Sequence, residues 1–312
     1  MKSKQRTWDL EDMPDQTGRT AVVTGVSEGG LGHHTALELA RRGARVVLAG
    51  RSPEKVERTA ELVTGEVPDA RLDRLTVDLA DLTSVRQAAE TAAALGPIDV
   101  LVNNAGVMAP PYSRTADGFE LQMATNHFGP FLLTGLLLDQ LVASADGRVV
   151  TVSSIGHRSA PRPPLDDPRT PRGRYLRWPE YGQTKLANLL FTYELQRRLE
   201  ERGLPVRALA AHPGIAGTHL AANGTFGRSS GGAATILDAA VKGLTQSAAM
   251  GALPTLMAAT DDLPGGTFCG PSGFQQIGGK PRVVGSSAAS HDREAQRRLW
   301  EISEQAVGLD WP

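Results

Sequence analysis

A tyrosine and a lysine four positions apart are the residues of this chain best suited to chemistry. Tyr181 and Lys185 stand in the run 181–188, and residues four apart on a helix share one face, so both side chains would reach the same cleft. A neighbouring ammonium group favours the phenolate and predicts a lowered pKa for Tyr181. Such a tyrosine could give a proton to a carbonyl oxygen, or take one from an alcohol, near neutral pH. Alone, the pair is more typical of a packed ring beside a solvated charge.

Strands and helices that could position this pair alternate along the chain. Six apolar runs of strand length occur at 20–24, 45–49, 71–77, 98–102, 148–152 and 206–210. Helical patterns separate most of them, beginning with 35–42. This alternation predicts an α/β fold: a Rossmann-type, doubly wound parallel sheet in a single domain, built as a three-layer αβα sandwich. Ligands bind such sheets beyond the carboxyl ends of the strands, so we expect the chemistry in those loops.

A glycine-rich loop follows the first apolar run and opens directly onto a helix. It reads Thr24-Gly25-Val26-Ser27-Glu28-Gly29-Gly30-Leu31-Gly32. Glycines let the backbone approach a pyrophosphate, whose charge is stabilised by the amide groups at a helix N-terminus. The strand before the loop and the helix after it favour a dinucleotide site over a plain turn. The expected contacts are Gly25, Ser27, Gly30, Leu31 and Gly32.

The end of the second run indicates which dinucleotide would bind. Where an NAD-binding chain places an acidic residue against the ribose, this chain has Arg51. An arginine there could bind a 2′-phosphate, which favours NADP(H) and leaves NAD(H) as the alternative. Asp78 and Leu79 follow the third run, where Asp78 could accept a hydrogen bond from the adenine amino group. An ordinary helix N-cap region is the competing interpretation of Asp78.

The composition argues against several classes of partner. The 312 residues carry 33 basic and 34 acidic side chains, 40% of the chain is hydrophobic, and the net charge is -1. Such a balance is typical of a globular enzyme and gives no field that would hold nucleic acid. Residues 1–20 lack the apolar core of a signal peptide, and no eighteen apolar residues run together. We therefore expect a cytoplasmic protein with no nucleic-acid or membrane partner.

No linker divides the chain, so we expect an N-terminal extension, 1–19, followed by one catalytic domain, 20–312. Residues 158–179 form a proline- and arginine-rich loop too long to be a simple connection. Residues 214–240 are rich in small residues and are interpreted as a substrate lid. Their apolar members suggest a hydrophobic cleft: Leu220, Phe226 and Ile236. Surface excursions of the chain are the alternative for both segments.

The order of these motifs resembles the short-chain dehydrogenase/reductase family from about Thr20 to the end of the chain. After the glycine loop, the motifs that carry the resemblance are Asp78, Asn103-Asn104-Ala105-Gly106, Asn126 in Thr125-Asn126-His127-Phe128-Gly129, Ser153-Ser154, the Tyr181/Lys185 pair and His212-Pro213-Gly214. The pair Asn126-His127, the run from Tyr181 to Leu195 and the long insertion before Tyr181 are similar to the retinol dehydrogenase-like subgroup.

The resemblance implies a catalytic tetrad and no need for a metal. Ser154 would hydrogen-bond the substrate oxygen, and Tyr181 would be the general acid in reduction. Lys185 would lower the pKa of Tyr181 and hold the nicotinamide ribose. Asn126 would support a water that relays protons to Lys185.

Further cofactor contacts and an assembly also follow from the resemblance. Asn104, Ala105 and Gly106 would line the adenosine side of the cofactor. The carboxamide of the nicotinamide would be flanked by Pro213, Gly214, Ile215 and Thr218. Family members commonly associate through the helices that bear Asn126 and Tyr181, which implies a homodimer or homotetramer.

Two features depart from the family pattern. Four residues separate Gly25 and Gly30 where the pattern has three, so either Gly29 or Gly30 could act as the second glycine. The carboxylate of Glu28 would be unfavourable beside a 2′-phosphate. Ser154 and Tyr181 lie 27 residues apart, roughly twice the spacing of shorter members, which is consistent with the loop at 158–179.

These observations together predict an NADP(H)-dependent oxidoreductase. It would interconvert the carbonyl and alcohol forms of a small-molecule, lipophilic substrate, with Tyr181 as general acid or base. Reduction of an imine or an activated double bond on the same scaffold is one alternative. A dinucleotide-binding sensor or scaffold without turnover is another, because fold alone does not establish function.

Overall fold

One eight-stranded sheet forms the centre of the molecule in the computed structural model, which describes residues 7–169, 174–215 and 246–311. The strand order is β3-β2-β1-β4-β5-β6-β7-β8. Strands β1 to β7 are parallel, and β8 runs antiparallel to β7 at the edge. The strands are β1 (Thr20–Thr24), β2 (Arg45–Gly50), β3 (Arg71–Thr76), β4 (Val100–Asn103), β5 (Gly147–Val152), β6 (Val206–Ala211), β7 (Phe268–Pro271) and β8 (Pro281–Val283).

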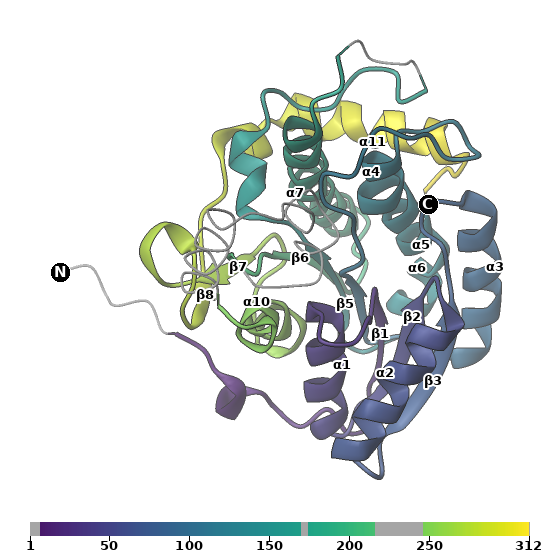
Figure 1. Cartoon of the computed structure of the whole chain (residues 1–312), viewed down its shortest axis with the longest axis vertical. Helices are drawn as coiled ribbons and strands as arrows, with labels where there is room; N and C mark the ends of the chain where they lie inside the picture. The colour runs from purple at the N-terminus through teal and green to yellow at the C-terminus, as the bar shows by residue number, and fades with distance from the viewer. Residues whose placement is uncertain (1–6, 170–173, 216–245, 312) are drawn as a thin grey trace, which may run out of the picture.

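Helices cover both faces of the sheet and make the three-layer sandwich seen in Figure 1. The helices of one face are α1 (Leu31–Arg41), α2 (Pro53–Glu66) and α10 (Ala248–Thr260). Those of the other face are α3 (Leu82–Ala92), α5 (Gly129–Leu136), α7 (Arg177–Glu201) and α11 (Arg293–Val307). Successive strand residues alternate between the two cores: Val22 packs on the α7 side and Val23 on the α1 side. The predicted fold class is confirmed.

Short helical segments complete the structure. They are η1 (Leu10–Asp12), η2 (Ala93–Leu95), α4 (Leu121–Met123), η3 (Ala124–Phe128), α6 (Leu138–Val142), η4 (Ile155–Ser159), η6 (Phe274–Gln276) and η7 (Ala288–His291). The segment η3 is a π-helical turn between α4 and α5. Because π-helical turns often mark functional positions, the presence of Asn126 in η3 is notable.

The six predicted strands agree with β1 to β6 within two residues at each end. The helix predicted over 35–42 begins earlier, at Leu31, because it starts directly at the glycine loop. The sequence patterns predict neither β7 nor β8, since both are very short and contain proline.

Both ends of the described chain pack against the body of the molecule. In the predicted N-terminal extension, Trp8 is buried and its main-chain N–H donates to the Pro281 carbonyl of β8. At the other end, Trp300 of α11 stacks on Phe191 of α7 with 5.9 Å between ring centres. Helix α11 thus lies against the helix that bears Tyr181, where the family resemblance predicts a second subunit (Figure 1). A homodimer or homotetramer stays a prediction.

Candidate active site

The glycine loop is shaped by contacts that exclude any side chain. Gly25 has a φ of 73°, and a Cβ added to it would lie 2.7 Å from the Cα of Ala105. A Cβ on Gly32 would lie 2.5 Å from the Gly25 carbonyl oxygen and 2.6 Å from Nδ2 of Asn104. Only glycine fits at these two positions. The close packing holds the loop after β1 against the loop after β4.

Free backbone amide groups at the start of α1 make this loop suited to a pyrophosphate. Gly30 is the N-cap of α1 and provides no side-chain cap, so the amide groups of Leu31 and Gly32 remain for an anion. The Gly30 N–H donates to the Ser27 carbonyl at 3.0 Å, and Gly29 adopts a φ of 67°. Gly30 therefore takes the helix-capping role, and the additional residue is accommodated at the turn through Gly29.

Thr24 and Asn104 tie the two loops together. The Asn104 side-chain amide donates to the carbonyl oxygens of Thr24 and Gly25 at 2.7 and 3.1 Å. The Thr24 hydroxyl oxygen accepts from the main-chain N–H groups of Asn104 and Ala105, each at 3.1 Å. The amide group of Asn104, predicted to line the adenosine, thus supports the glycine loop. The sequence patterns did not single out Thr24, although it is the last residue of β1.

Charged groups on the expected adenine side are exposed and partly paired. Arg51 Nη1 lies 3.8 Å from a carboxylate oxygen of Asp78, and the Arg51 side chain is 75% exposed. A carboxylate oxygen of Glu28 lies 3.6 Å from Nε of Arg58 on α2. The positive charge of Arg58 offsets the Glu28 charge that would be unfavourable beside a 2′-phosphate. The Leu79 side chain is buried in the core, so only its main chain could contact an adenine.

The structure brings the four predicted catalytic residues together. Ser154 lies two residues after the end of β5 and is the N-cap of η4, and its side chain hydrogen-bonds Tyr181. Lys185 Nζ lies 5.7 Å from the centre of the Tyr181 ring. A Cβ added to Gly106 would lie 3.0 Å from Oδ1 of Asn126 and 3.6 Å from Lys185 Nζ. One small volume therefore holds the serine, tyrosine, lysine and asparagine.

Burial dominates the electrostatics of this group. It lowers the pKa of Lys185 to about 8, and the ammonium group donates to the Val152 carbonyl at 3.0 Å. Burial also raises the pKa of Tyr181, which the hydrogen bond with Ser154 only partly offsets. The expected lowering of the Tyr181 pKa is therefore wrong here, because desolvation of the phenolate is the largest influence on it.

The side chain of Asn126 connects η3 to the loop after β4 and to α7. Its Oδ1 accepts from the Val107 N–H at 2.7 Å. Its Nδ2 donates to the Val107 carbonyl at 3.0 Å and to the Thr184 hydroxyl at 2.9 Å. Because both amide protons are used, the Asn126 side chain has no further donor for a relay water.

The segment after β6 is held by the connection between β7 and β8. Gly214 has a φ of 68°, and a Cβ on it would lie 2.2 Å from the Ile277 carbonyl oxygen. The Ile215 N–H donates to the same carbonyl at 2.8 Å, and Gln246 donates to the Pro213 carbonyl. Thr218 and the lid from residue 216 onward, with Leu220, Phe226 and Ile236, lie outside the described residues.

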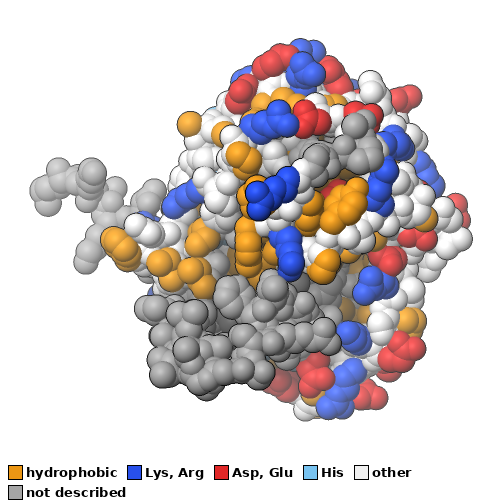
Figure 2. Space-filling view, turned by 45° about the horizontal axis from the view of Figure 1, so that its top comes forward, with side chains coloured by type: hydrophobic (Ala, Val, Ile, Leu, Met, Phe, Trp, Pro, Cys, Tyr) orange, Lys and Arg blue, Asp and Glu red, His pale blue; other side chains and the backbone are white. Residues whose placement is uncertain are grey.

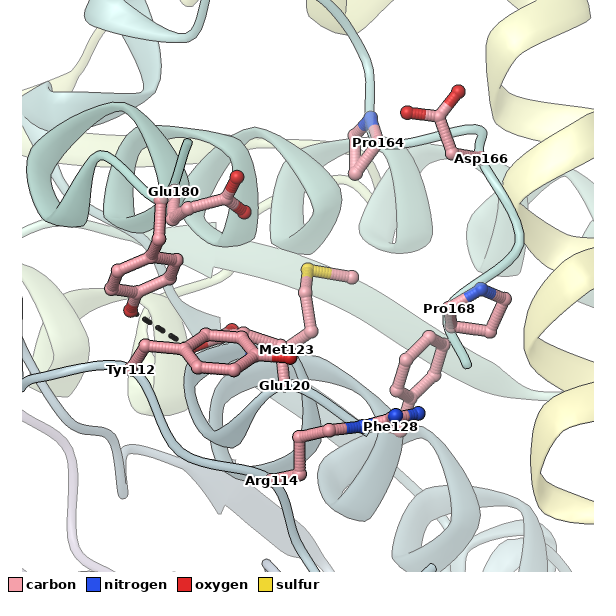
Figure 3. Close-up of a pocket in the computed structure, with 10 residues that line it drawn as sticks. Tyr112, Arg114, Glu120, Met123, Phe128, Pro164, Asp166, Pro168 and Glu180 are labelled. Carbon is pink, nitrogen blue, oxygen red and sulfur yellow. Dashed lines mark hydrogen bonds between the residues drawn. The ribbon is translucent and has the colours of Figure 1, made fainter. Parts of the chain in front are cut away.

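The long loop before α7 forms one wall of a pocket with the segment between β4 and α5 (Figure 3). Tyr175 donates to Glu120 at 2.9 Å and accepts from Gln122 at 2.7 Å. Burial raises the pKa of Glu120, and hydrogen bonds from the main-chain N–H groups of Gln122 and Met123 and from the Tyr175 hydroxyl oppose that rise. None of the predicted site residues lines this pocket, whose lining is Tyr112, Arg114, Glu120, Met123, Phe128, Pro164, Asp166, Pro168, Tyr175 and Glu180.

Large hydrophobic side chains are exposed near the start of α7. Trp178 is 46% exposed and lies edge-on to Tyr181, with 6.3 Å between the ring centres. Leu176 is 48% exposed. Figure 2 shows hydrophobic side chains gathered in the middle of one face, with lysine and arginine side chains among them.

The described residues contain neither a cluster of metal ligands nor a helix that could span a membrane. Within residues 7–169, 174–215 and 246–311, no group of three His, Cys, Asp or Glu side chains could hold a metal ion. No helix in these ranges has the length and apolar character that crossing a bilayer requires.

Known proteins resemble this chain over nearly its whole length. A sequence model for short chain dehydrogenases matches residues 19–163. Human retinol dehydrogenase 13 is 40% identical over 302 residues, which cover 95% of this chain and 86% of that protein. A crystal structure of an uncharacterised protein from Mycobacterium paratuberculosis is 42% identical with a TM-score of 0.79, covering 98% of this chain and 100% of that chain.

A more distant relative has a solved structure that contains a cofactor. It is a short chain dehydrogenase from Escherichia coli CFT073 complexed with NADPH, 25% identical with a TM-score of 0.62. The match covers 81% of this chain and 97% of that one. The similarity to retinol dehydrogenase 13 over nearly the whole chain, with the match to the family model, shows that this chain belongs to the short-chain dehydrogenase/reductase family of oxidoreductases, in the retinol dehydrogenase-like subgroup.

Proposed function

We propose that this protein is an NADP(H)-dependent oxidoreductase that interconverts carbonyl and alcohol groups of small, lipophilic molecules. The observation that carries the proposal is the convergence of Ser154, Tyr181 and Lys185, with Asn126 beside them, at the carboxyl ends of the central strands. A binding protein would have no need for a buried lysine ammonium group held 5.7 Å from the centre of a tyrosine ring.

The glycine loop supports nicotinamide dinucleotide as the cofactor. The loop can approach a pyrophosphate closely because Gly25 and Gly32 have no side chains. The N-terminus of α1 has no side-chain cap, so its amide groups can bind the negative charge. When bound, the nicotinamide supplies or accepts the hydride. Arg51 supports the phosphorylated form, because an exposed guanidinium group could pair with a 2′-phosphate. The E. coli relative in complex with NADPH adds to this preference.

The catalytic side chains have distinct roles in the proposal. Ser154 would orient the substrate oxygen, since its hydroxyl already contacts Tyr181. The raised pKa keeps Tyr181 protonated at neutral pH, so it can donate its proton to the oxygen of a carbonyl being reduced. Lys185, with a pKa of about 8, could then return a proton to the tyrosine. Asn126 would support the water that relays protons to Lys185.

A lipophilic substrate is proposed from the surroundings of Tyr181. The exposed ring of Trp178 and the exposed Leu176 lie one turn or slightly more before Tyr181 and offer apolar surface. Several relatives are named retinol dehydrogenases, and retinol is a lipophilic alcohol. A cytoplasmic location and a homo-oligomeric state are also part of the proposal.

Oxidation of NADPH and of NADH by the purified protein would test the proposed function. The panel should include lipophilic aldehydes and ketones, hydrophilic carbonyl compounds, imines and activated alkenes. We expect turnover with lipophilic carbonyl compounds and a higher kcat/KM with NADPH. NADPH binding without turnover of any compound would instead support a dinucleotide-binding sensor, and turnover confined to imines or alkenes would redefine the reaction.

A further inference from the structure

Three buried histidines stand beside the segments that carry the proposed chemistry. His127 directly follows Asn126, His157 lies three residues after Ser154, and His212 precedes Pro213-Gly214. Their side chains are at most 1% exposed. Burying a polar ring is costly unless it is hydrogen-bonded, so the partners of these rings indicate what they do.

His127 connects the catalytic π-helical turn to the C-terminal helix. Its Nε2 lies 2.8 Å from the hydroxyl oxygen of Ser303 on α11. The Ser303 hydroxyl already donates to the Leu299 carbonyl at 2.7 Å, so it can only accept from His127. The geometry therefore places the proton of a neutral His127 on Nε2.

His157 connects Ser154, the serine proposed to orient the substrate, to Ser287 in the C-terminal part of the chain. The main-chain N–H of Ser287 donates to Nε2 of His157 at 3.1 Å. A neutral ring that accepts at Nε2 carries its proton on Nδ1, which lies 2.6 Å from the Ser154 carbonyl oxygen. The ring thus holds the main chain of the serine proposed to orient the substrate.

His212 connects the proposed carboxamide segment to η6. The Gly214 N–H donates to Nδ1 of His212 at 3.2 Å, so the ring carries its proton on Nε2. That nitrogen lies 2.9 Å from the side-chain oxygen of Gln276. Gln276 has a φ of 62°, a conformation costly for a residue with a side chain, and the hydrogen bond helps to hold it.

One hydrogen-bond partner of each histidine lies within residues 276–303, which contain none of the proposed catalytic tetrad. We propose that His127, His157 and His212 are positioning residues that fix the three catalytic segments against residues 276–303. Burial lowers the pKa of each ring, to about 3 for His127 and His212, which keeps the rings neutral as this arrangement requires. The kinetic consequence rests on the proposed function, whereas the hydrogen-bond pattern does not.

The pattern can be tested without turnover by nitrogen-15 NMR of the histidine rings in the full chain at pH 7. We expect the Nε2–H tautomer for His127 and His212 and the Nδ1–H tautomer for His157, with each signal assigned by its loss in a single His→Gln variant. A protonated ring, or the opposite tautomer at any of the three positions, would overturn the inference even if the enzyme is inactive.

Kinetics of Ser303→Ala test whether the connections matter for turnover. We expect kcat to fall about tenfold, because a small displacement of a catalytic group lowers the rate, while the Kd for NADPH stays within about twofold. Thr260→Val is the matched control: it also removes a buried hydroxyl that donates to the carbonyl four residues earlier, at 2.8 Å, but on α10. We expect it to keep the kcat of the unmodified protein.

A second pair of variants separates the hydrogen bond from packing. His127→Gln keeps a donor that can reach Ser303, and we expect it to retain most of the kcat. His127→Leu fills a similar volume without a donor and should resemble Ser303→Ala. Equal kcat in Ser303→Ala and the unmodified protein, or an equal loss in Thr260→Val, would contradict a positioning role. A lack of turnover in the unmodified protein would count against the proposed function, and the NMR result would then decide this inference alone.

Discussion

The cofactor side and the catalytic side of this molecule are supported in different ways. On the cofactor side, the loops after β1 and β4 are held together by hydrogen bonds between Thr24 and Asn104 and by the close approach of glycine residues to neighbouring backbone. All of these contacts lie within residues 24–105. On the catalytic side, the segments around Asn126 and Ser154 are held by residues more than a hundred positions away. The cofactor site is thus assembled from neighbouring motifs, whereas the catalytic site depends on the C-terminal segment.

Adding a side chain to the glycine loop should weaken cofactor binding and leave the catalytic side unchanged. In Gly32→Ala the added Cβ meets main-chain and amide atoms at 2.5 and 2.6 Å, so the loop must move. We expect the affinity for NADPH to fall at least about a hundredfold, because the amide groups of α1 lose their alignment. Titration of NADPH fluorescence measures this. Gly65→Ala in α2, where a Cβ meets nothing within 4 Å, should bind NADPH normally.

Replacing a buried tryptophan in each of the two cores should distinguish a loss of stability from a loss of catalytic activity. Trp300 and Trp8 are both almost fully buried, Trp300 against α7 and Trp8 in the opposite core. We expect Trp300→Ala and Trp8→Ala each to lower the free energy of unfolding by about 3–5 kcal/mol in urea denaturation. At temperatures where both variants are folded, only Trp300→Ala should also lower kcat. An equal loss of kcat in both would remove the distinction between the two sides.

Replacing Lys185 should stabilise the fold while abolishing turnover. Burial lowers its pKa to about 8 from the ordinary 10.5, so between these pH values the unfolded chain binds a proton that the folded chain has lost. The stability of the unmodified protein should therefore rise with pH across this window. At pH 7, Lys185→Met should be more stable by about 2 kcal/mol, since the cost of burying a charge is gone. Lower stability of this variant at pH 7 would contradict the assigned pKa shift.

The smallest expected change concerns the choice of dinucleotide. Arg51 is exposed beside Asp78, so Arg51→Ala should leave the fold intact. We expect the Kd for NADPH to rise about tenfold and that for NADH to stay within about twofold, because only NADPH has the 2′-phosphate. Equal weakening for both cofactors would place Arg51 elsewhere in the site.

The same division explains what could be predicted from the sequence. Strands β1 to β6 are apolar runs bounded by polar or glycine residues, and the glycine loop, Ser154, Tyr181 and Lys185 are marked by residue type and spacing. The approach of Lys185 to Tyr181 follows from helical spacing alone. These features are local, so periodicity and motif order suffice to find them.

The hydrogen bonds between residues far apart in the sequence could not be predicted, because no local sequence pattern indicates them. His127 and Ser303 are 176 positions apart, and nothing in either neighbourhood indicates the other. Strand β8 has only three residues, and Gln276 belongs to a turn whose backbone conformation is unusual for its residue type. The Tyr181 pKa was predicted in the wrong direction for a related reason: its burial depends on packing that the spacing of Tyr181 and Lys185 does not reveal.

Turnover by Tyr181→Phe, measured beside the unmodified protein with NADPH and its best carbonyl substrate, tests the central claim most directly. The variant loses only the phenolic hydroxyl, so NADPH should bind with a Kd within about twofold of the original. We expect kcat to fall by about 10²–10⁴, the contribution of a positioned general acid. Retention of most of the turnover would show that Tyr181 does not donate the proton and would contradict the account of the catalytic side.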